Sequence, residues 1–98
     1  MIAHKGENVF VCSVFQPTSG SFNLADYDVV CIVSNVKGKV VLKKSTDIIR
    51  NDEDNAVGCT LTATDTKVLN GLYFVSFELW ANGQKVLSNE VEQITFLE

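Results

Sequence analysis

The stretch from Leu72 to Ala81 constrains the fold more than any other part of the sequence, because its side chains alternate in character. Every second residue is large and apolar: Tyr73, Val75, Phe77 and Leu79. The residues between them form a second set: Phe74, Ser76, Glu78 and Trp80. Successive side chains of a β-strand point to opposite faces, whereas a helix would scatter both sets around its axis. The pattern therefore predicts a strand with one face in the core.

A hairpin follows this strand. Asn82-Gly83 is the two-residue turn that joins antiparallel strands most readily, and Gln84 to Ser88 has the composition of a returning strand. Val91 to Leu97 is predicted to close the domain as a further strand.

The rest of the chain repeats this organisation. Short runs rich in Val, Ile, Phe, Leu and Thr are separated by turn residues, which is typical of a sandwich or barrel. The predicted strands are Asn8–Phe15, Tyr27–Val36, Lys39–Lys44 and Ala56–Thr62. Residues 64–71 are predicted to form one helical turn, and Ile48 and Ile49 are candidates for a short extra strand. We therefore expect an all-β, immunoglobulin-like Greek-key β-sandwich of about seven strands with one short helical turn; a small barrel is the alternative.

Length and charge limit the classes of function. With 98 residues the chain makes one domain, 1–98, and residues 1–7 are expected to be frayed. The net charge is −4, and the lysines at 37, 39, 43 and 44 are interpreted as solvent-facing or edge-protecting, so no nucleic-acid partner is expected. No apolar run reaches the roughly 18 residues of a membrane span, and no export signal is recognised at the start. The expected location is the cytoplasm at synthesis.

Cys12, Cys31 and Cys59 all fall in strand-like apolar stretches. An odd count with wide spacing is poor material for a disulfide framework, so buried free thiols are expected. A bridge between sheets, Cys12–Cys31 or Cys31–Cys59, is the alternative.

No catalytic, metal or cofactor site is predicted. The lone histidine, His4, lies near the terminus without a recognisable nucleophile, and ligands with zinc spacing are absent from the sequence. The acidic run of residues 51–55 is interpreted as a solvated loop, with calcium binding as the alternative. Asp26 and Asp28 could suggest a glycosidase carboxylate pair, but no aromatic platform accompanies them. We expect a protein that is not an enzyme.

Phe74 and Trp80 are the candidate interaction surface. They share the strand face opposite the predicted core, where exposed aromatic side chains form a credible binding patch. In the alternative interpretation, Trp80 covers an edge of the core at the strand end.

Several segments, taken in order, match a known pattern. They are Phe22-Asn23-Leu24-Ala25-Asp26-Tyr27-Asp28-Val29, Lys37-Gly38-Lys39-Val40-Val41, Gly58-Cys59-Thr60-Leu61-Thr62, Thr64-Asp65-Thr66, and Asn70-Gly71-Leu72-Tyr73 continuing to Trp80. Together they resemble the immunoglobulin-like N-terminal domain of bacteriophage baseplate upper proteins and related small phage proteins. In that family a helical or trimerising region follows the domain, whereas this sequence stops at Glu98, so a stand-alone relative and an excised domain both stay open.

The resemblance implies a structural component of a phage or prophage virion, in the baseplate or tail, that docks other proteins or copies of itself. Virion association is then the expected location after assembly. The competing hypothesis is a carbohydrate-binding sandwich that uses Phe74 and Trp80 as a stacking platform.

Overall fold

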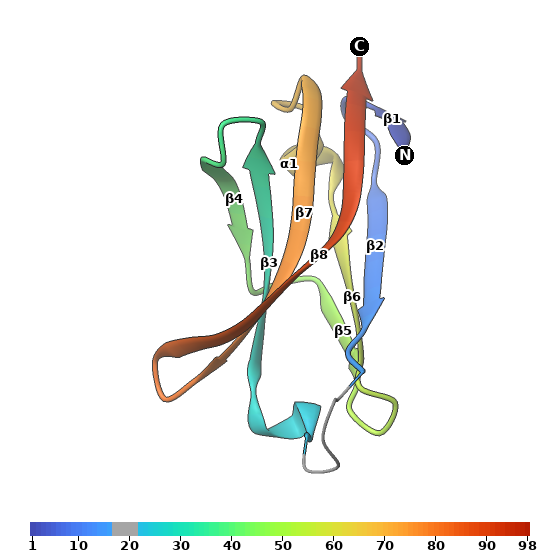
Figure 1. The fold of residues 1–98 in the computed structure, drawn as a ribbon. Coiled ribbons are helices and arrows are strands. Elements are labelled where there is room, and N and C mark those ends of the chain that lie inside the picture. The colour runs from blue at the N-terminus through green and yellow to red at the C-terminus, as the bar shows by residue number, and fades with distance from the viewer. Residues whose placement is uncertain (17–21) are drawn as a thin grey trace.

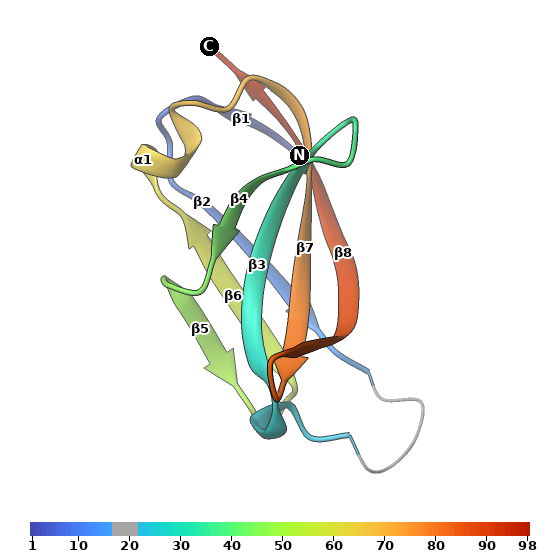
Figure 2. The same cartoon turned by 90° about the vertical axis from the view of Figure 1, so that its left-hand side faces the viewer.

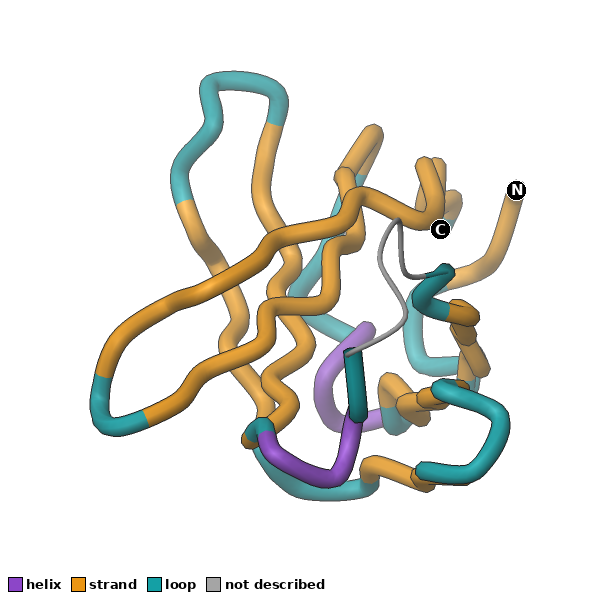
Figure 3. The backbone as a smooth tube through the Cα atoms, turned by 60° about the horizontal axis from the view of Figure 1, so that its bottom comes forward, coloured by secondary structure: helices purple, strands orange, loops and turns teal. Residues whose placement is uncertain are grey.

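The computed structural model describes residues 1–16 and 22–98, and within them eight strands form two sheets (Figure 1). The strands are β1 (Ile2–His4), β2 (Val9–Val14), β3 (Asp28–Asn35), β4 (Val40–Lys44), β5 (Ile48–Asn51), β6 (Ala56–Leu61), β7 (Gly71–Ala81) and β8 (Gln84–Leu97). The helical segments are the 3-10 turn η1 (Leu24–Asp26) and the single turn α1 (Ala63–Thr66). Figure 3 shows how short both are beside the strands.

The two sheets pack as the layers of a sandwich (Figure 2). One sheet has the order β1-β8-β7-β3-β4 and the other β2-β6-β5. The strands β8-β7-β3-β4 correspond to the G-F-C-C′ strands of immunoglobulin domains and β2-β6-β5 to the B-E-D strands, while β1 adds an edge strand beside β8. The predicted all-β, immunoglobulin-like sandwich is confirmed.

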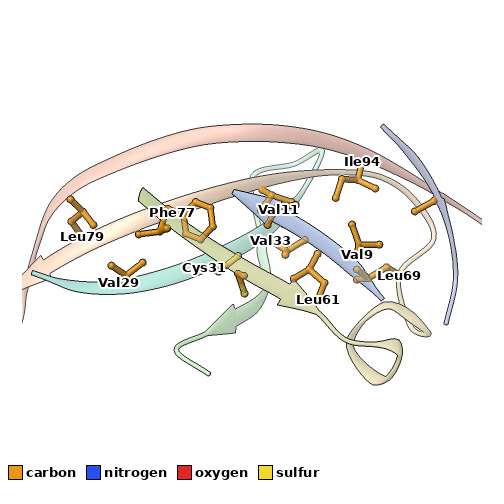
Figure 4. Packing of buried hydrophobic residues seen from close by; sticks show 14 of the residues in the cluster. Val9, Val11, Val29, Cys31, Val33, Leu61, Leu69, Phe77, Leu79 and Ile94 are labelled. Atoms are coloured by element: carbon orange, nitrogen blue, oxygen red, sulfur yellow. The ribbon is translucent and has the colours of Figure 1, made fainter. Parts of the chain in front are cut away.

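The core lies between the sheets and uses the predicted face of β7. Val75, Phe77 and Leu79 have no exposed surface, and Tyr73 packs against the same cluster. Figure 4 shows side chains from β3 and β7 meeting Val9 and Val11 of β2 and Leu61 of β6.

The connection between β6 and β7 is fixed by local hydrogen bonds. The Thr62 hydroxyl accepts from the Asp65 N–H while the Asp65 carboxylate accepts from the Thr62 N–H, which is the capping box of a helix start. After α1, the Tyr73 hydroxyl accepts from the Asn70 N–H at 3.2 Å. A tyrosine bonded back to the upstream backbone at this corner is a hallmark of immunoglobulin-like folds.

The N-terminal segment is more ordered than expected. Ile2–His4 forms β1, which pairs in parallel with Thr95–Leu97 of β8, so the expectation of fraying over residues 1–7 is wrong there. Gly6 and Glu7 are tied to the buried Thr66, whose hydroxyl accepts from the Gly6 N–H and donates to the Glu7 carbonyl. Long-range pairing of this kind leaves little trace in local sequence.

The C-terminal strand is longer than expected. β8 runs without a break from Gln84 to Leu97, where two strands were predicted. Register shifts opposite Val75/Ser76 and Leu79/Trp80 let the strand bend while its pairing with β7 continues. The expected short strand at Ile48 and Ile49 is present as β5.

Candidate functional site

Phe74 and Trp80 lie on one outer face, as the alternation of β7 predicted. Phe74 pairs in register with Ser34, and Trp80 with Asp28, on the face of the five-stranded sheet that points away from the core. Both are partly buried. Trp80 lies six positions after Phe74 along the strand, which is a distance of roughly 20 Å. They are therefore two separate sites on one face.

The Trp80 ring is occupied by neighbouring charged groups. The Lys43 ammonium lies 4.9 Å from the ring centroid, and the indole N–H donates to Glu78 at 3.1 Å. Lys85 in turn lies 3.7 Å from the Glu78 carboxylate. One face of the Trp80 ring is therefore covered by the Lys43 ammonium. A ligand could stack on that face only if Lys43 moved away.

Phe74 borders an open hollow of about 290 Å³. The other lining residues come from the β3–β4 turn and from neighbouring strands: Ser34, Asn35, Val36, Gly38, Ser76 and Glu90. Hydroxyl, amide and carboxylate groups therefore surround one aromatic ring. This chemistry suits a polar ligand with one apolar face.

A second surface, on the outer face of the three-stranded sheet, was not predicted as a site. Phe10, Cys12 and Val14 alternate outward from β2, opposite Thr60, Gly58 and Ala56 of β6. Ile49 of β5 pairs with Gly58 from the other side. The relative exposures of Phe10, Val14 and Ile49 are 53%, 57% and 65%. We call Phe10, Cys12, Val14 and Ile49 the apolar face.

Gly58 lies buried beneath the apolar face. A Cβ at this position would collide with Cζ of Phe10 and lie 2.8 Å from its Cε1. The absence of a side chain lets the phenyl ring lie across β6. Phe10 of β2 and Ile49 of β5 therefore both border Gly58 on this face.

The signal for this surface was present in the sequence. Both sets of alternating residues in the predicted strand Asn8–Phe15 are mostly apolar, which is compatible with burial on both sides. The structure buries Val9 and Val11 and leaves Phe10 and Val14 exposed. Cys12 is exposed, so the expectation that all three cysteines are buried is wrong at this position, whereas Cys31 and Cys59 are buried free thiols.

Lys44 forms the most buried charged cluster among the described residues. It is 6% exposed, and its ammonium donates to Asp65, to Asp47 at 2.8 Å and to the Thr60 carbonyl at 3.0 Å. Burial acts to lower the pKa of Lys44, but its bonds to Asp47 and Asp65 outweigh this effect and the net pKa is raised. Burial acts to raise the pKa of Asp65, and the bonds from Lys44 and Thr62 reverse it, so that this pKa is lowered.

The Lys44 cluster is structural, because the ammonium donates to two carboxylates and one backbone carbonyl of the protein itself. Its hydrogen bonds connect β4, an edge strand of the five-stranded sheet, to β6 of the other sheet and to α1. The interpretation of Lys44 as a solvent-facing charge is wrong: in register it lies opposite the inward-facing Cys31.

The acidic loop is held by its own side chains. Asp52 is paired with Arg50 at 3.0 Å, and Asp54 accepts from the Asn51 amide at 2.8 Å. Arg50 also donates to the backbone carbonyls of Leu24 and Tyr27, which anchors η1 to β5. Within residues 1–16 and 22–98, no three His, Cys, Asp or Glu side chains are grouped as a metal site requires.

The remaining candidate residues stay apart. His4 is exposed, and its Nδ1 lies 3.1 Å from the Glu98 carbonyl oxygen. Asp26 belongs to η1 and Asp28 begins β3, and both are exposed. In the part of the chain that the structure describes, no helix is long and apolar enough to cross a membrane.

Comparison with known proteins supports the fold. No family model matches the sequence, and no curated protein does. Among solved structures, the chain is similar to part of the endo-beta-1,4-mannanase from Thermotoga petrophila, with a TM-score of 0.59 and 14% sequence identity. The match covers 98% of this chain and 17% of the mannanase chain. The shared architecture is thus one that occurs as a module within a longer chain.

Proposed function

We propose that this chain is a non-enzymatic protein–protein interaction module and a structural component of a phage or prophage virion, in the baseplate or tail. The apolar face carries the proposal. Exposed Phe10 and Val14 of β2 and Ile49 of β5 lie on the same outer face of a regular sheet, where another protein surface can cover them.

Two further observations support this proposal. The ordered resemblance to the baseplate upper protein domain extends over most of the chain and includes the capped turn at Thr62 and Asp65 and the corner at Tyr73. In addition, the ionisable side chains of the described residues are engaged in structural contacts or dispersed over the surface. A docking role needs no group to transfer protons or electrons.

The proposal is tested in particles. A tagged copy of the full chain is supplied from a plasmid during phage production, and gradient-purified particles are examined by mass spectrometry. We expect incorporation of the unaltered chain and its loss in the double variant Phe10→Ser and Ile49→Ser. The matched control is Val68→Ser with Val86→Ser, which removes two apolar side chains of similar exposure, 72% and 55%, outside both the apolar face and the Phe74 hollow.

Circular dichroism establishes that both double variants fold. Presence of the chain in the cell but absence from the particles would overturn the virion role. Equal incorporation of the two double variants would show that the apolar face is not the docking surface.

A carbohydrate-binding function is the second candidate, and the Phe74 hollow favours it. One aromatic ring surrounded by Ser34, Asn35 and Glu90 can stack on a sugar ring while the polar groups bond its hydroxyls. One similar solved structure is that of an endo-beta-1,4-mannanase. Titration calorimetry with β-1,4-linked manno-oligosaccharides tests it: binding should be lost in Phe74→Ala and kept in Phe10→Ala, and no heat with any oligosaccharide would exclude it.

A further inference from the structure

Two cysteines from opposite sheets approach each other in the core. Cys31 of β3 points inward between Val29 and Val33, and Cys59 of β6 points inward between Val57 and Leu61. Both thiols are free, and both residues are completely buried. Figure 4 shows the Cys31 side chain directed from β3 towards β6.

Contacts around the pair bring the two strands together. Lys44, the register partner of Cys31, reaches across to β6 and donates to the carbonyl of Thr60, the residue after Cys59. The Cys59 thiol lies 3.8 Å from this same carbonyl oxygen. Both thiols also belong to the same cluster of buried side chains between the two sheets. The two cysteine side chains therefore face the same buried region from opposite sheets.

We propose that Cys31 and Cys59 form a disulfide between the two sheets when the chain folds in the presence of a low-molecular-weight disulfide such as oxidised glutathione. One cysteine thiolate attacks the glutathione disulfide and releases one glutathione thiolate. The second cysteine thiolate attacks the resulting mixed disulfide and releases the other. The two protein thiols lose two protons and two electrons, and one glutathione disulfide is reduced to two thiols.

Folding is the stage at which the bond forms. In the folded protein both cysteines are completely buried, so oxidising reagents do not reach their thiols. Cys12, which is exposed, is the cysteine that reacts in the folded state. Oxidation therefore distinguishes a chain that folded in an oxidising medium from one that was oxidised afterwards.

This bridge would differ from that of antibody domains. Their conserved disulfide joins strands B and F, whereas β3 and β6 occupy the C and E positions of the same topology. It would close a loop of the chain from Cys31 to Cys59, which contains the edge strands β4 and β5. Restricting this loop in the unfolded chain is the main way in which such a bond stabilises a domain.

The experiment uses the full chain with Cys12→Ser, so that Cys31 and Cys59 are the only thiols. The protein is refolded from denaturant with oxidised and reduced glutathione, or with reductant alone. We expect the oxidised sample to lose the mass of two hydrogen atoms and to yield one peptide that links positions 31 and 59. Its thermal midpoint should rise by roughly 10 °C.

The control variant adds Cys59→Ala to Cys12→Ser and should show neither change. Circular dichroism of the reduced samples confirms that both variants fold. Glutathione adducts without a bridge, or disulfide-linked dimers, would overturn the proposal. A bridged monomer with an unchanged or lower midpoint would overturn the stabilising effect of the bond.

Discussion

The phenyl ring of Phe10 lies over Gly58, so the exposed aromatic side chain depends on a residue without a side chain two register positions away. Gly58→Ala has two opposing effects on stability. Alanine restricts the unfolded chain and favours the strand by about 0.5–1 kcal/mol. Its Cβ also displaces the ring of Phe10 and uncovers β6. Because the Phe10 side chain is 53% exposed and only the far end of its ring meets the new methyl group, we expect a net change within about 1 kcal/mol.

A double-mutant cycle in urea separates the two effects. In the Phe10→Ala background, where no ring is displaced, Gly58→Ala should raise the free energy of unfolding by about 0.5–1 kcal/mol. The two substitutions should therefore be coupled. Additive effects would show that the ring does not depend on Gly58.

The corner tyrosine provides an independent test of the fold. Tyr73→Phe removes the acceptor of the Asn70 N–H while keeping the ring in contact with Phe96, whose centroid lies 6.0 Å away. The loss of one hydrogen bond should lower the free energy of unfolding by about 1 kcal/mol in urea. The matched control is Tyr27→Phe, whose ring stacks on Phe22 and whose hydroxyl makes no hydrogen bond within residues 1–16 and 22–98. Equal losses in both variants would contradict the role of the corner.

The core was predictable from local sequence, whereas several of its neighbours were not. Alternation in Leu72–Ala81 identifies the buried face because burial on one side of a strand repeats every two residues. β1 has three residues and pairs with the other end of the chain, so no local period marks it. Lys44 follows Lys43 and resembles a surface charge until the register places it opposite Cys31 and beside Asp65.

For the candidate surfaces, too, local sequence predicted some features, whereas others depend on how the strands pair. Phe74 and Trp80 were correctly placed on the outer face of a strand, because alternation determines which face a residue occupies. The occupation of the Trp80 ring by Lys43 depends on the pairing of three strands and could not be predicted from one. The apolar face escaped prediction because a strand that is apolar on both sides does not indicate which side remains uncovered.

Removing the Lys44 ammonium should destabilise the sandwich. Lys44→Met keeps the apolar stem but leaves Asp65, which is 17% exposed, without its cation. We expect a loss of about 2 kcal/mol in the free energy of unfolding, because Asp47 is half exposed and can be solvated while Asp65 keeps its Thr62 partners. Lys43→Met, at the adjacent outward-facing position, should cost less than about 1 kcal/mol. Similar losses in the two variants would show that the buried cluster adds nothing.

The same cluster predicts how stability depends on pH. Asp65 has a lowered pKa in the folded protein, so its contribution is present above its unfolded value of 3.8 and is lost as the pH falls through the folded value. Lys44 has a raised pKa, so its contribution is complete below its unfolded value of 10.5 and is lost as the pH rises through the folded value. The free energy of unfolding, measured in urea from pH 2 to 12, should therefore be constant at intermediate pH and should fall at both the acid and the alkaline end. Asp65→Asn should lower the plateau and flatten the acid decline, whereas Glu53→Gln in the exposed loop should leave both unchanged. If the free energy of unfolding of Asp65→Asn falls as much in acid as that of the unaltered protein, the loss of stability in acid must come from other carboxylates.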